Sequence, residues 1–342
     1  MSIVLSALQY LGYILIFPGF LFCFVVGLLL SGIDRKVVAM MQKRVGPPVL
    51  QPFYDFFKLC GKETIIPAAA SSKVVFLMAP LVGLASLVVL QLFIPIFNFT
   101  AFSGMADIIV ILYLLLIPAL AMILGGAASG SPYAGVGLSR EMVTIISCEL
   151  PLVLVLLAVG KTVGSATGEG LTFSFTAIAA YQAAHGSLVL KASMIPAAIA
   201  MLMVIPGETG NHPFDAAEAE TEICEGLLAE YSGAPLGVYK LSHAIKMLTL
   251  TSMFVALFLG GIGTGIENLV AAIGLSGAAA GGVVTLLGAV VLVLLCVVLT
   301  VVSISFVHAV TARLKIEQIF KFYWTTVSGL ALISLVLAWY GL

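Results

Sequence analysis

The chain has 342 residues, of which 61% are hydrophobic and only 9% carry a formal charge. Soluble domains have about 25% charged residues, so this composition excludes a soluble enzyme, a nucleic-acid-binding protein and a disordered chain. The five cysteines have no ligand spacing, which argues against a zinc site or an iron–sulfur cluster held by this chain alone. We therefore expect an all-α protein whose solvent is the lipid bilayer.

Eight stretches are long and apolar enough to cross a bilayer, because a spanning helix needs about 20 apolar residues. They cover residues 11–31, 74–97, 107–126, 142–160, 188–206, 236–261, 281–308 and 322–341. The first stretch lacks the basic flank and the cleavage site of a signal peptide, so we expect it to be retained as a helix. The whole chain, residues 1–342, is predicted to form a single polytopic membrane domain.

The loops between these spans differ in their basic residues. Eleven Lys and Arg residues lie in the loops after the first, third and seventh spans, whereas the loops after the second, fourth and sixth hold only Lys161. Because cytoplasmic loops are enriched in Lys and Arg, we expect an integral protein of the cytoplasmic membrane with both termini outside. The odd-numbered loops would then be cytoplasmic, at residues 32–73, 127–141, 207–235 and 309–321.

The first of these loops contains a predicted amphipathic helix. Leu50, Phe53, Phe56, Phe57 and Cys60 recur at helical spacing, and the charged side chains of the segment fall on the other side. A helix of this kind lies along a membrane surface or beneath a partner subunit.

The loop at 207–235 is strongly acidic. It has no Lys or Arg, and its seven carboxylates are Glu208, Asp215, Glu218, Glu220, Glu222, Glu225 and Glu230. We expect a helix that starts with Asp215 as its N-cap, which would place Glu218, Glu222 and Glu225 on one face. Carboxylates crowded in this way raise one another's pKa values and titrate as a coupled group. The alternative is a solvated acidic face that neutralises a basic partner.

Ionisable residues also lie at the ends of the predicted spans or inside them. Glu141 opens the fourth span and Glu149 lies within it, whereas Lys240, His243 and Lys246 share one face at the start of the sixth. A charge inside a membrane is costly and therefore marks a functional candidate. For the two lysines, snorkelling to the lipid headgroups is the alternative. Together with the acidic loop, these residues are predicted to form a hydrated polar path.

Four stretches of the sequence carry a family resemblance. The first runs from Asp34-Arg35-Lys36 through Gln42-Lys43-Arg44-Val45-Gly46-Pro47 and Gln51-Pro52-Phe53-Tyr54-Asp55 to Lys62-Glu63. The others are Ser139-Arg140-Glu141 to Glu149, Asn211-His212-Pro213-Phe214-Asp215 to Gly233, and Arg313-Leu314-Lys315-Ile316-Glu317-Gln318. In this order they resemble the H subunit, the membrane protein that anchors the peripheral arm of respiratory complex I.

Two departures from the H-subunit pattern indicate which related subunits the chain resembles most. Gly46-Pro47 is followed almost at once by Gln51-Pro52, where quinone-reducing members have a longer stretch, and Glu225 is an extra carboxylate. The short linker and the acidic run at 222–226 are more similar to the counterpart subunit of membrane-bound, energy-converting nickel–iron (NiFe) hydrogenases of the formate-hydrogenlyase and Ech type.

This resemblance implies an ion-translocating subunit that docks a hydrogenase arm and couples its redox chemistry to movement of H⁺ or Na⁺. The chain itself would bind no cofactor or metal. The nickel–iron centre and the iron–sulfur clusters would belong to partners, namely the hydrogenase large and small subunits and an iron–sulfur subunit, and antiporter-like membrane subunits would lie beside the chain. No nucleic acid is implied.

The residues assigned to these roles fall into two groups. The predicted ion path contains Glu149, Glu141, Asp215, Glu218, Glu220, Glu222, Glu225, Glu230, Lys240, His243 and Lys246. The predicted arm-docking residues are Arg35, Lys36, Lys43, Arg44, Asp55, Lys58, Glu63 and Arg313. Three other functions stay open: a quinone-binding H subunit of a complex I-type NADH:quinone oxidoreductase, a stand-alone secondary transporter, and a passive membrane anchor.

Overall fold

The structure is a computed structural model that describes residues 2–97, 99–102, 107–168, 170–272 and 278–341. Side chains are described from Leu8 onward, except at positions 220, 221, 278 and 279. The described residues form helices and loops with no strand, apart from two isolated β-bridges. The predicted all-α class is thereby confirmed.

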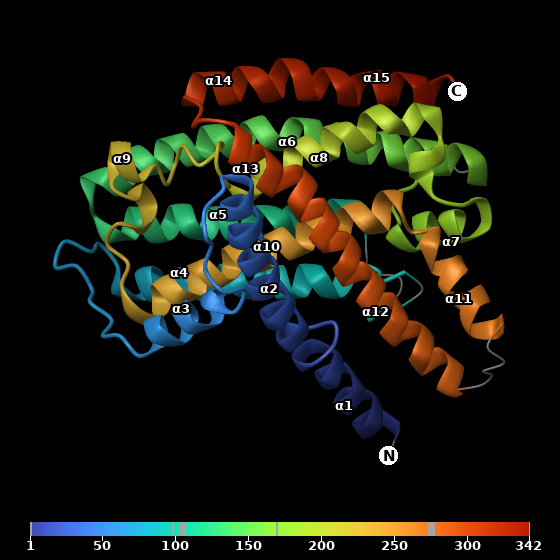
Figure 1. Cartoon of the computed structure of the whole chain (residues 1–342), viewed down its shortest axis with the longest axis horizontal. Coiled ribbons are helices and arrows are strands. Elements are labelled where there is room, and N and C mark those ends of the chain that lie inside the picture. Colours follow the sequence, from blue (N-terminus) through green and yellow to red (C-terminus); the bar gives the residue numbers. More distant parts are fainter. Residues whose placement is uncertain (1, 98, 103–106, 169, 273–277, 342) are drawn as a thin grey trace.

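Eight helical segments are long and apolar enough to cross a membrane, as predicted. In Figure 1 most of them run across the view, with the helix pair α1–α2 and helix α12 lying obliquely. Their helices are α1 (Ser2–Leu15), α2 (Phe20–Met41), α4 (Lys73–Phe93), α5 (Ile108–Ser129), α6 (Pro132–Thr167), α8 (Ile195–Thr209), α10 (Gly233–Phe258), α12 (Ala278–Thr300), α13 (Phe306–Val310), α14 (Ile316–Lys321) and α15 (Ser328–Trp339). π-Helical turns at Val301–Ser305 and Phe322–Val327 join α12 to α13 and α14 to α15.

Shorter elements complete the fold. They are α3 (Gln51–Cys60), α7 (Phe175–His185), α9 (Glu220–Ile223), α11 (Ile262–Ala272) and 3₁₀ turns at Leu188–Leu190, Ala192–Met194 and Gly226–Leu228. Helices α3 and α9 lie at one end of the bundle, and both the start of α1 and the end of α15 lie away from that end (Figure 1).

Helix α10 is the centre of the bundle. It packs against α2, α3, α4, α8 and α12, and most of its side chains are buried. Small residues allow the close contacts: a Cβ on Gly27 of α2 would lie 3.1 Å from the carbonyl oxygen of Ala244. Because α10 has almost no lipid-facing side, its polar side chains must find partners inside the protein.

Two of the predicted boundaries were wrong. Helix α2 continues to Met41, so the Asp34-Arg35-Lys36 motif lies on a helix instead of in the loop. Helix α6 begins at Pro132, which reduces the predicted loop at 127–141 to two residues and places Glu141 more than two turns inside the helix. Hydropathy marks only the lipid-embedded part of a span, whereas α2 continues beyond that part to Met41 and α6 starts before it, with Pro132 in the first helical turn.

The acidic loop also differs from the prediction. Its only α-helix among the described residues, α9, has four residues, and Cys224 and Glu225 that follow it have left-handed φ values of 50° and 66°. Glu218 precedes this helix, so it does not share a helical face with Glu222 and Glu225. The Asp215 carboxylate does not cap a helix, because its oxygens face Arg313 and His212.

The amphipathic helix is confirmed as α3. The ring of Phe24 on α2 meets the rings of Phe53 and Phe56 edge-on, at centroid distances of 5.9 and 5.3 Å. The side chains of Tyr54 and Lys58 are exposed on the opposite side. Helix α3 therefore closes one end of the bundle with its aromatic face against α2 and α10.

Two glycines two residues apart on α6 give a matched test of how this helix holds the acidic loop. A Cβ on Gly137 would lie 3.0 Å from the backbone nitrogen of Leu227 and 3.1 Å from the carbonyl oxygen of Ala217, whereas Gly135 has no atom within 4 Å. We expect Gly137→Val to lower the stability of the purified protein by about 1–3 kcal/mol through overpacking. Gly135→Val should change it by less than about 0.5 kcal/mol. Thermal unfolding midpoints in detergent measure both, and equal midpoints would contradict the packing.

Candidate functional site

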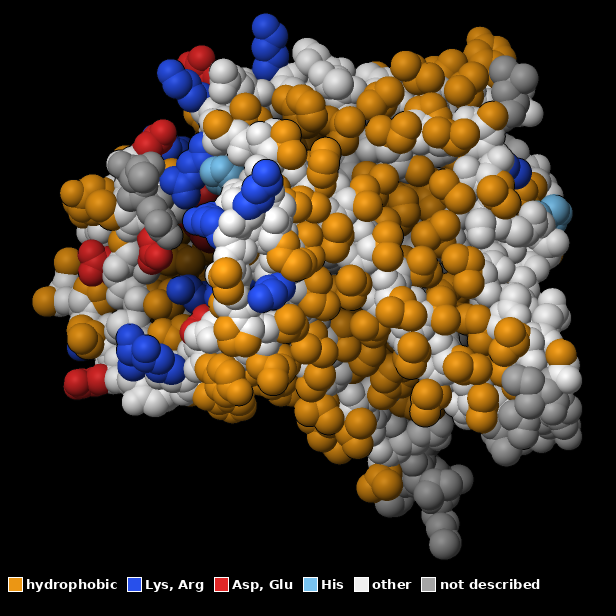
Figure 2. Space-filling view, viewed as in Figure 1, with side chains coloured by type: hydrophobic (Ala, Val, Ile, Leu, Met, Phe, Trp, Pro, Cys, Tyr) orange, Lys and Arg blue, Asp and Glu red, His pale blue; other side chains and the backbone are white. Residues whose placement is uncertain are grey.

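The charged side chains gather at one end of the molecule. Figure 2 shows Lys, Arg, Asp and Glu side chains over the end that carries α3 and α9, whereas the broad middle of the same face is hydrophobic. This separation is the one expected of a membrane protein whose polar end lies at the aqueous boundary.

A cavity of about 440 Å³ opens into this polar end. Its walls come from α2, α5, α6, α8, α10, α13 and the acidic loop. The ionisable residues that line it are Arg35, Glu141, Glu208, His212, Asp215, Glu218, Glu225, Tyr239, Lys240, His243, Lys246, His308 and Arg313. Lys240, His243 and Lys246, which were predicted to share one face of α10, thus line the same cavity as carboxylates from α6, α8 and the acidic loop.

A buried ion pair forms part of the cavity wall. The Nζ atom of Lys246 is 3.2 Å from a carboxylate oxygen of Glu208, and the two side chains are only 11% and 8% exposed. Lys246 therefore points into the protein and does not snorkel to the headgroups. Desolvating two charges costs several kcal/mol per ion, and their attraction offsets this cost only while both partners are present.

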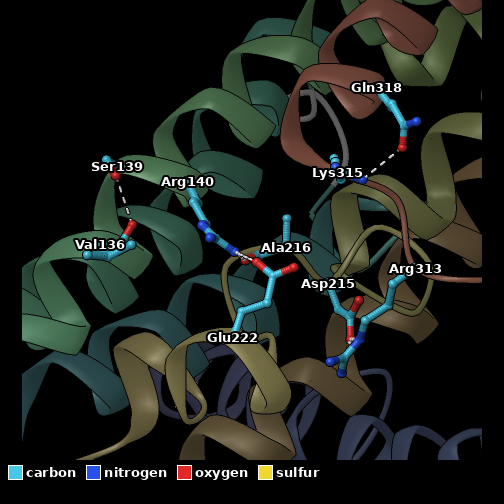
Figure 3. Close-up of polar contacts among 9 residues, drawn as sticks. All are labelled: Val136, Ser139, Arg140, Asp215, Ala216, Glu222, Arg313, Lys315 and Gln318. Carbon is cyan, nitrogen blue, oxygen red and sulfur yellow. Dashed lines mark hydrogen bonds and ion pairs between the residues drawn. The ribbon is translucent and has the colours of Figure 1, made fainter.

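Two arginines, one on a helix and one in a linker, hold the acidic loop (Figure 3). Arg140 of α6 pairs with Glu222 at 2.5 Å and donates a hydrogen bond to the carbonyl oxygen of Ala216. Arg313, in the linker after α13, pairs with Asp215 at 2.7 Å. The loop, which has no Lys or Arg of its own, is therefore partly neutralised by arginines from elsewhere in the chain. Its arginine partners lie 82 and 98 residues away in sequence, beyond the reach of local pattern analysis.

Glu218 belongs to this loop and lines the cavity. Burial, together with the negative charges of Glu141, Glu225 and Asp215, raises the pKa of Glu218 from 4.5 to about 7, although Lys240 opposes the shift. Glu218 is thus a carboxylate that exchanges a proton near neutral pH. The predicted crowding of carboxylates is real, but it arises from tertiary contacts and not from one helix face.

The other predicted path residues lie further out. Glu149 is partly buried on α6 but does not line the cavity, and Glu222 and Glu230 are exposed. The side chain of Glu220 lies outside the described residues. Their part in ion movement stays a prediction.

The predicted docking residues share the polar end with the cavity. Arg35 pairs with Asp55 of α3 at 3.0 Å, and the Nζ atom of Lys36 donates a hydrogen bond to the carbonyl oxygen of Gly46. The remaining basic and acidic side chains of this group are exposed, at Lys43, Arg44, Lys58, Glu63 and Arg313.

Sequence reasoning gave no specific role to several residues of the site. Glu208 was counted with the acidic loop but not placed in the ion path, although it is the partner of Lys246. The rings of His212 and His308 lie 5.0 Å apart at the cavity wall. Asp34 is buried and accepts a hydrogen bond from the Ser305 hydroxyl at 2.7 Å. Glu208 lies one residue before the end of α8, and a carboxylate so close to a spanning helix could have marked it as a candidate.

Comparison with known proteins agrees with this architecture. The NADH dehydrogenase family profile matches residues 14–339. Hydrogenase-4 component C of Escherichia coli (strain K12) is 35% identical over 232 residues, or 68% of this chain and 70% of that protein. The H subunit of the NADH-quinone oxidoreductase of Thermomicrobium roseum is 36% identical over 249 residues, or 67% of this chain and 72% of that protein. A chain in the structure of the membrane-bound sulfane sulfur reductase, an archaeal respiratory membrane complex, superposes with a TM-score of 0.82 at 29% identity, covering 97% of this chain and 98% of that one.

Eight spanning helices, a charged cavity at one end and these relatives define a membrane subunit of a complex I-like assembly. The chain belongs to the NADH dehydrogenase family. The resemblance predicted from its motifs, to both the H subunit and its hydrogenase counterpart, is thereby confirmed.

The pKa of Glu218 gives a prediction with a defined sign. Its folded pKa of about 7 lies above the ordinary 4.5, so the folded protein favours the protonated acid and loses that stabilisation as the pH rises from 4.5 to 7. We expect Glu218→Gln, which stays neutral, to gain stability relative to the wild type across this window. The carboxylic-acid band in the infrared spectrum that disappears near pH 7 should be missing from the variant. Glu222→Gln is the control, and a band that survives in Glu218→Gln would refute the assignment.

The Lys246–Glu208 pair predicts strong coupling between two substitutions. Lys246→Met leaves a buried carboxylate without its cation and should cost about 3–5 kcal/mol. Adding Glu208→Gln removes the uncompensated charge, so the double variant should be more stable than Lys246→Met alone, with a coupling energy of at least about 1 kcal/mol. Unfolding of the four proteins of the cycle measures this energy, and additive losses would show that the two groups do not interact.

Proposed function

We propose that the chain is the ion-translocating membrane subunit of an energy-converting nickel–iron hydrogenase complex. It docks the hydrogenase arm at its polar end and couples redox chemistry there to movement of H⁺ or Na⁺. The observation that carries the proposal is the cavity in which Glu141, Glu208 and Glu218 meet Lys246 and His243. The similarity to hydrogenase-4 component C supports a hydrogenase as the partner.

A charge that appears in the docked arm is strong enough to shift the pKa of a carboxylate in the cavity. A unit charge that appears about 10 Å from a carboxylate changes its energy by about 1.7 kcal/mol at an effective dielectric constant of about 20, or roughly one pKa unit. Glu218, whose pKa is about 7, would change its proton occupancy in response to such a charge at neutral pH. A redox change in a docked arm can thus be read as a proton bound or released at the cavity.

The acidic loop lies where an arm could act on it. Glu222 is exposed and paired with Arg140, whereas Asp215 and Glu218 of the same loop line the cavity. In this proposal the arm contacts the polar end, over the exposed side chains of Lys43, Arg44 and Lys58. The redox centres belong to the arm, and the antiporter-like subunits pack against the apolar faces.

A second candidate is the quinone-binding subunit of a complex I-type oxidoreductase. The similarity to the H subunit of an NADH-quinone oxidoreductase at 36% identity favours it, and the cavity has a volume typical of small-molecule sites. The two candidates differ in the electron acceptor, which is a proton in the first and a quinone in the second.

The test uses the intact complex reconstituted in liposomes. We expect hydrogen evolution or uptake without added quinone, accompanied by ion movement across the membrane. Glu208→Gln removes a cavity carboxylate and leaves Lys246 without its partner, so it is measured on complexes that have assembled; there it should reduce ion movement at least tenfold while hydrogen activity falls by less than half. Glu317→Gln, an exposed carboxylate on α14, is the control and should behave as the wild type.

The outcomes separate the candidates. Quinone reduction without hydrogen chemistry would favour the second candidate. Ion movement at the wild-type rate in Glu208→Gln would rule out an ion path through the cavity, and ion flux through the chain reconstituted alone would indicate an independent transporter.

A further inference from the structure

A line of polar residues leaves the cavity along α10. Every third residue from 240 to 252 is polar, namely Lys240, His243, Lys246, Thr249 and Ser252. We call these five residues the polar ridge. Residues three apart are neighbours on a helix surface, and at 1.5 Å per residue the ridge extends over about 18 Å. Its first three members line the cavity, whereas Thr249 and Ser252 lie beyond it and are buried.

The outer part of the ridge is linked by hydrogen bonds. Both hydroxyls bond to backbone carbonyls of α10 itself: that of Thr249 lies 3.1 and 3.0 Å from the carbonyl oxygens of Ile245 and Lys246, and that of Ser252 lies 2.9 Å from the Thr249 carbonyl oxygen. The Ser252 hydroxyl also lies 3.0 Å from the Oε1 atom of Gln91, which extends from the last turn of α4. The far end of the ridge thus contacts a buried amide group in the last turn of α4.

That amide group is incompletely satisfied. Gln91 is fully buried, and its Nε2 atom has no hydrogen-bond partner among the described residues. Turning the amide over would pair Nε2 with Ser252 and leave Oε1 unpaired instead, so one polar atom lacks a partner in either orientation. A buried amide that stays unpaired costs about 1–3 kcal/mol, and ordered water is the usual partner of such groups in proteins.

A second buried amide follows at the end of α10. Gln182 of α7 donates from Nε2 to the carbonyl oxygens of Ala256 and Leu257 at 2.9 and 3.0 Å. Its Oε1 atom has no partner in the described part of the chain, and it lies where a Cβ on Gly260 would meet it at 3.0 Å. Gly260 is partly exposed, so the unpaired oxygen is close to the surface at the end opposite the cavity.

We propose that the polar ridge, Gln91 and Gln182 bind a file of ordered water molecules that carries protons between the cavity and the opposite face of the membrane. This inference rests on the proposed function, and it adds a path through this subunit itself. Each transfer breaks one O–H bond and forms another, so no electron moves. A proton suits the path better than a metal cation, because α10 has no acidic residue to supply a counter-charge.

The test uses the whole complex in liposomes, with proton movement followed by a pH-sensitive dye and electron transfer measured in the same sample. Gln91→Leu removes the unpaired amide and should lower the number of protons moved per electron at least tenfold. Ser86→Ala is the matched control, because Ser86 is also buried on α4 but bonds only within its own helix. A high-resolution map of the complex should show water within hydrogen-bond distance of Gln91 in the wild type and none there in the variant.

Ser252→Ala provides a second variant if Gln91→Leu does not assemble, and it too should lower proton movement. Wild-type proton movement in either assembled variant, or a map of the wild type with no water at Gln91, would overturn the path. Glu208→Gln separates this inference from the proposed function. If Glu208→Gln stops proton movement while Gln91→Leu and Ser252→Ala do not, only the path along α10 fails. If Glu208→Gln also moves protons normally, the proposed function fails.

Discussion

The buried ion pair between Lys246 and Glu208 is the interaction on which the site depends. Neither charge would be stable alone at 11% and 8% exposure inside a membrane protein. Together they fix the end of α8 against α10, the central helix, and so determine where the other walls of the cavity meet. The carboxylates around them remain in a polar environment that α10 shields from lipid.

Charged partners from other elements also hold the acidic loop. Its short helix and turns are held by Arg140 from α6 and by Arg313 from the linker after α13. Glu218 pairs with neither arginine, and burial, together with the negative charges of Glu141, Glu225 and Asp215, raises its pKa to about 7. The loop therefore combines carboxylates that arginines hold in place with one, Glu218, that titrates near neutral pH.

The sequence predicted the features that depend on neighbouring residues, and it could not predict contacts between residues that are distant in the chain. The spans and α3 were predicted because hydropathy and helical spacing are local properties, and the shared face of Lys240, His243 and Lys246 follows from the helix period alone. The ends of α2 and α6 were misjudged, since charged residues continue a helix beyond the apolar region. The partners of Asp215, Glu222 and Glu208 could not be predicted, because each comes from an element distant in sequence and no single-sequence pattern encodes that pairing.

The two arginine contacts have a mechanical consequence. Arg140 extends from the fourth span, whereas Arg313 follows the seventh, so one short loop is fastened to two spans at once. If those spans shift relative to each other, the loop must either follow one of them or lose one of its contacts. The loop is thereby sensitive to the separation of the two spans, and a movement that detaches Asp215 from Arg313 would place another unpaired negative charge beside Glu218.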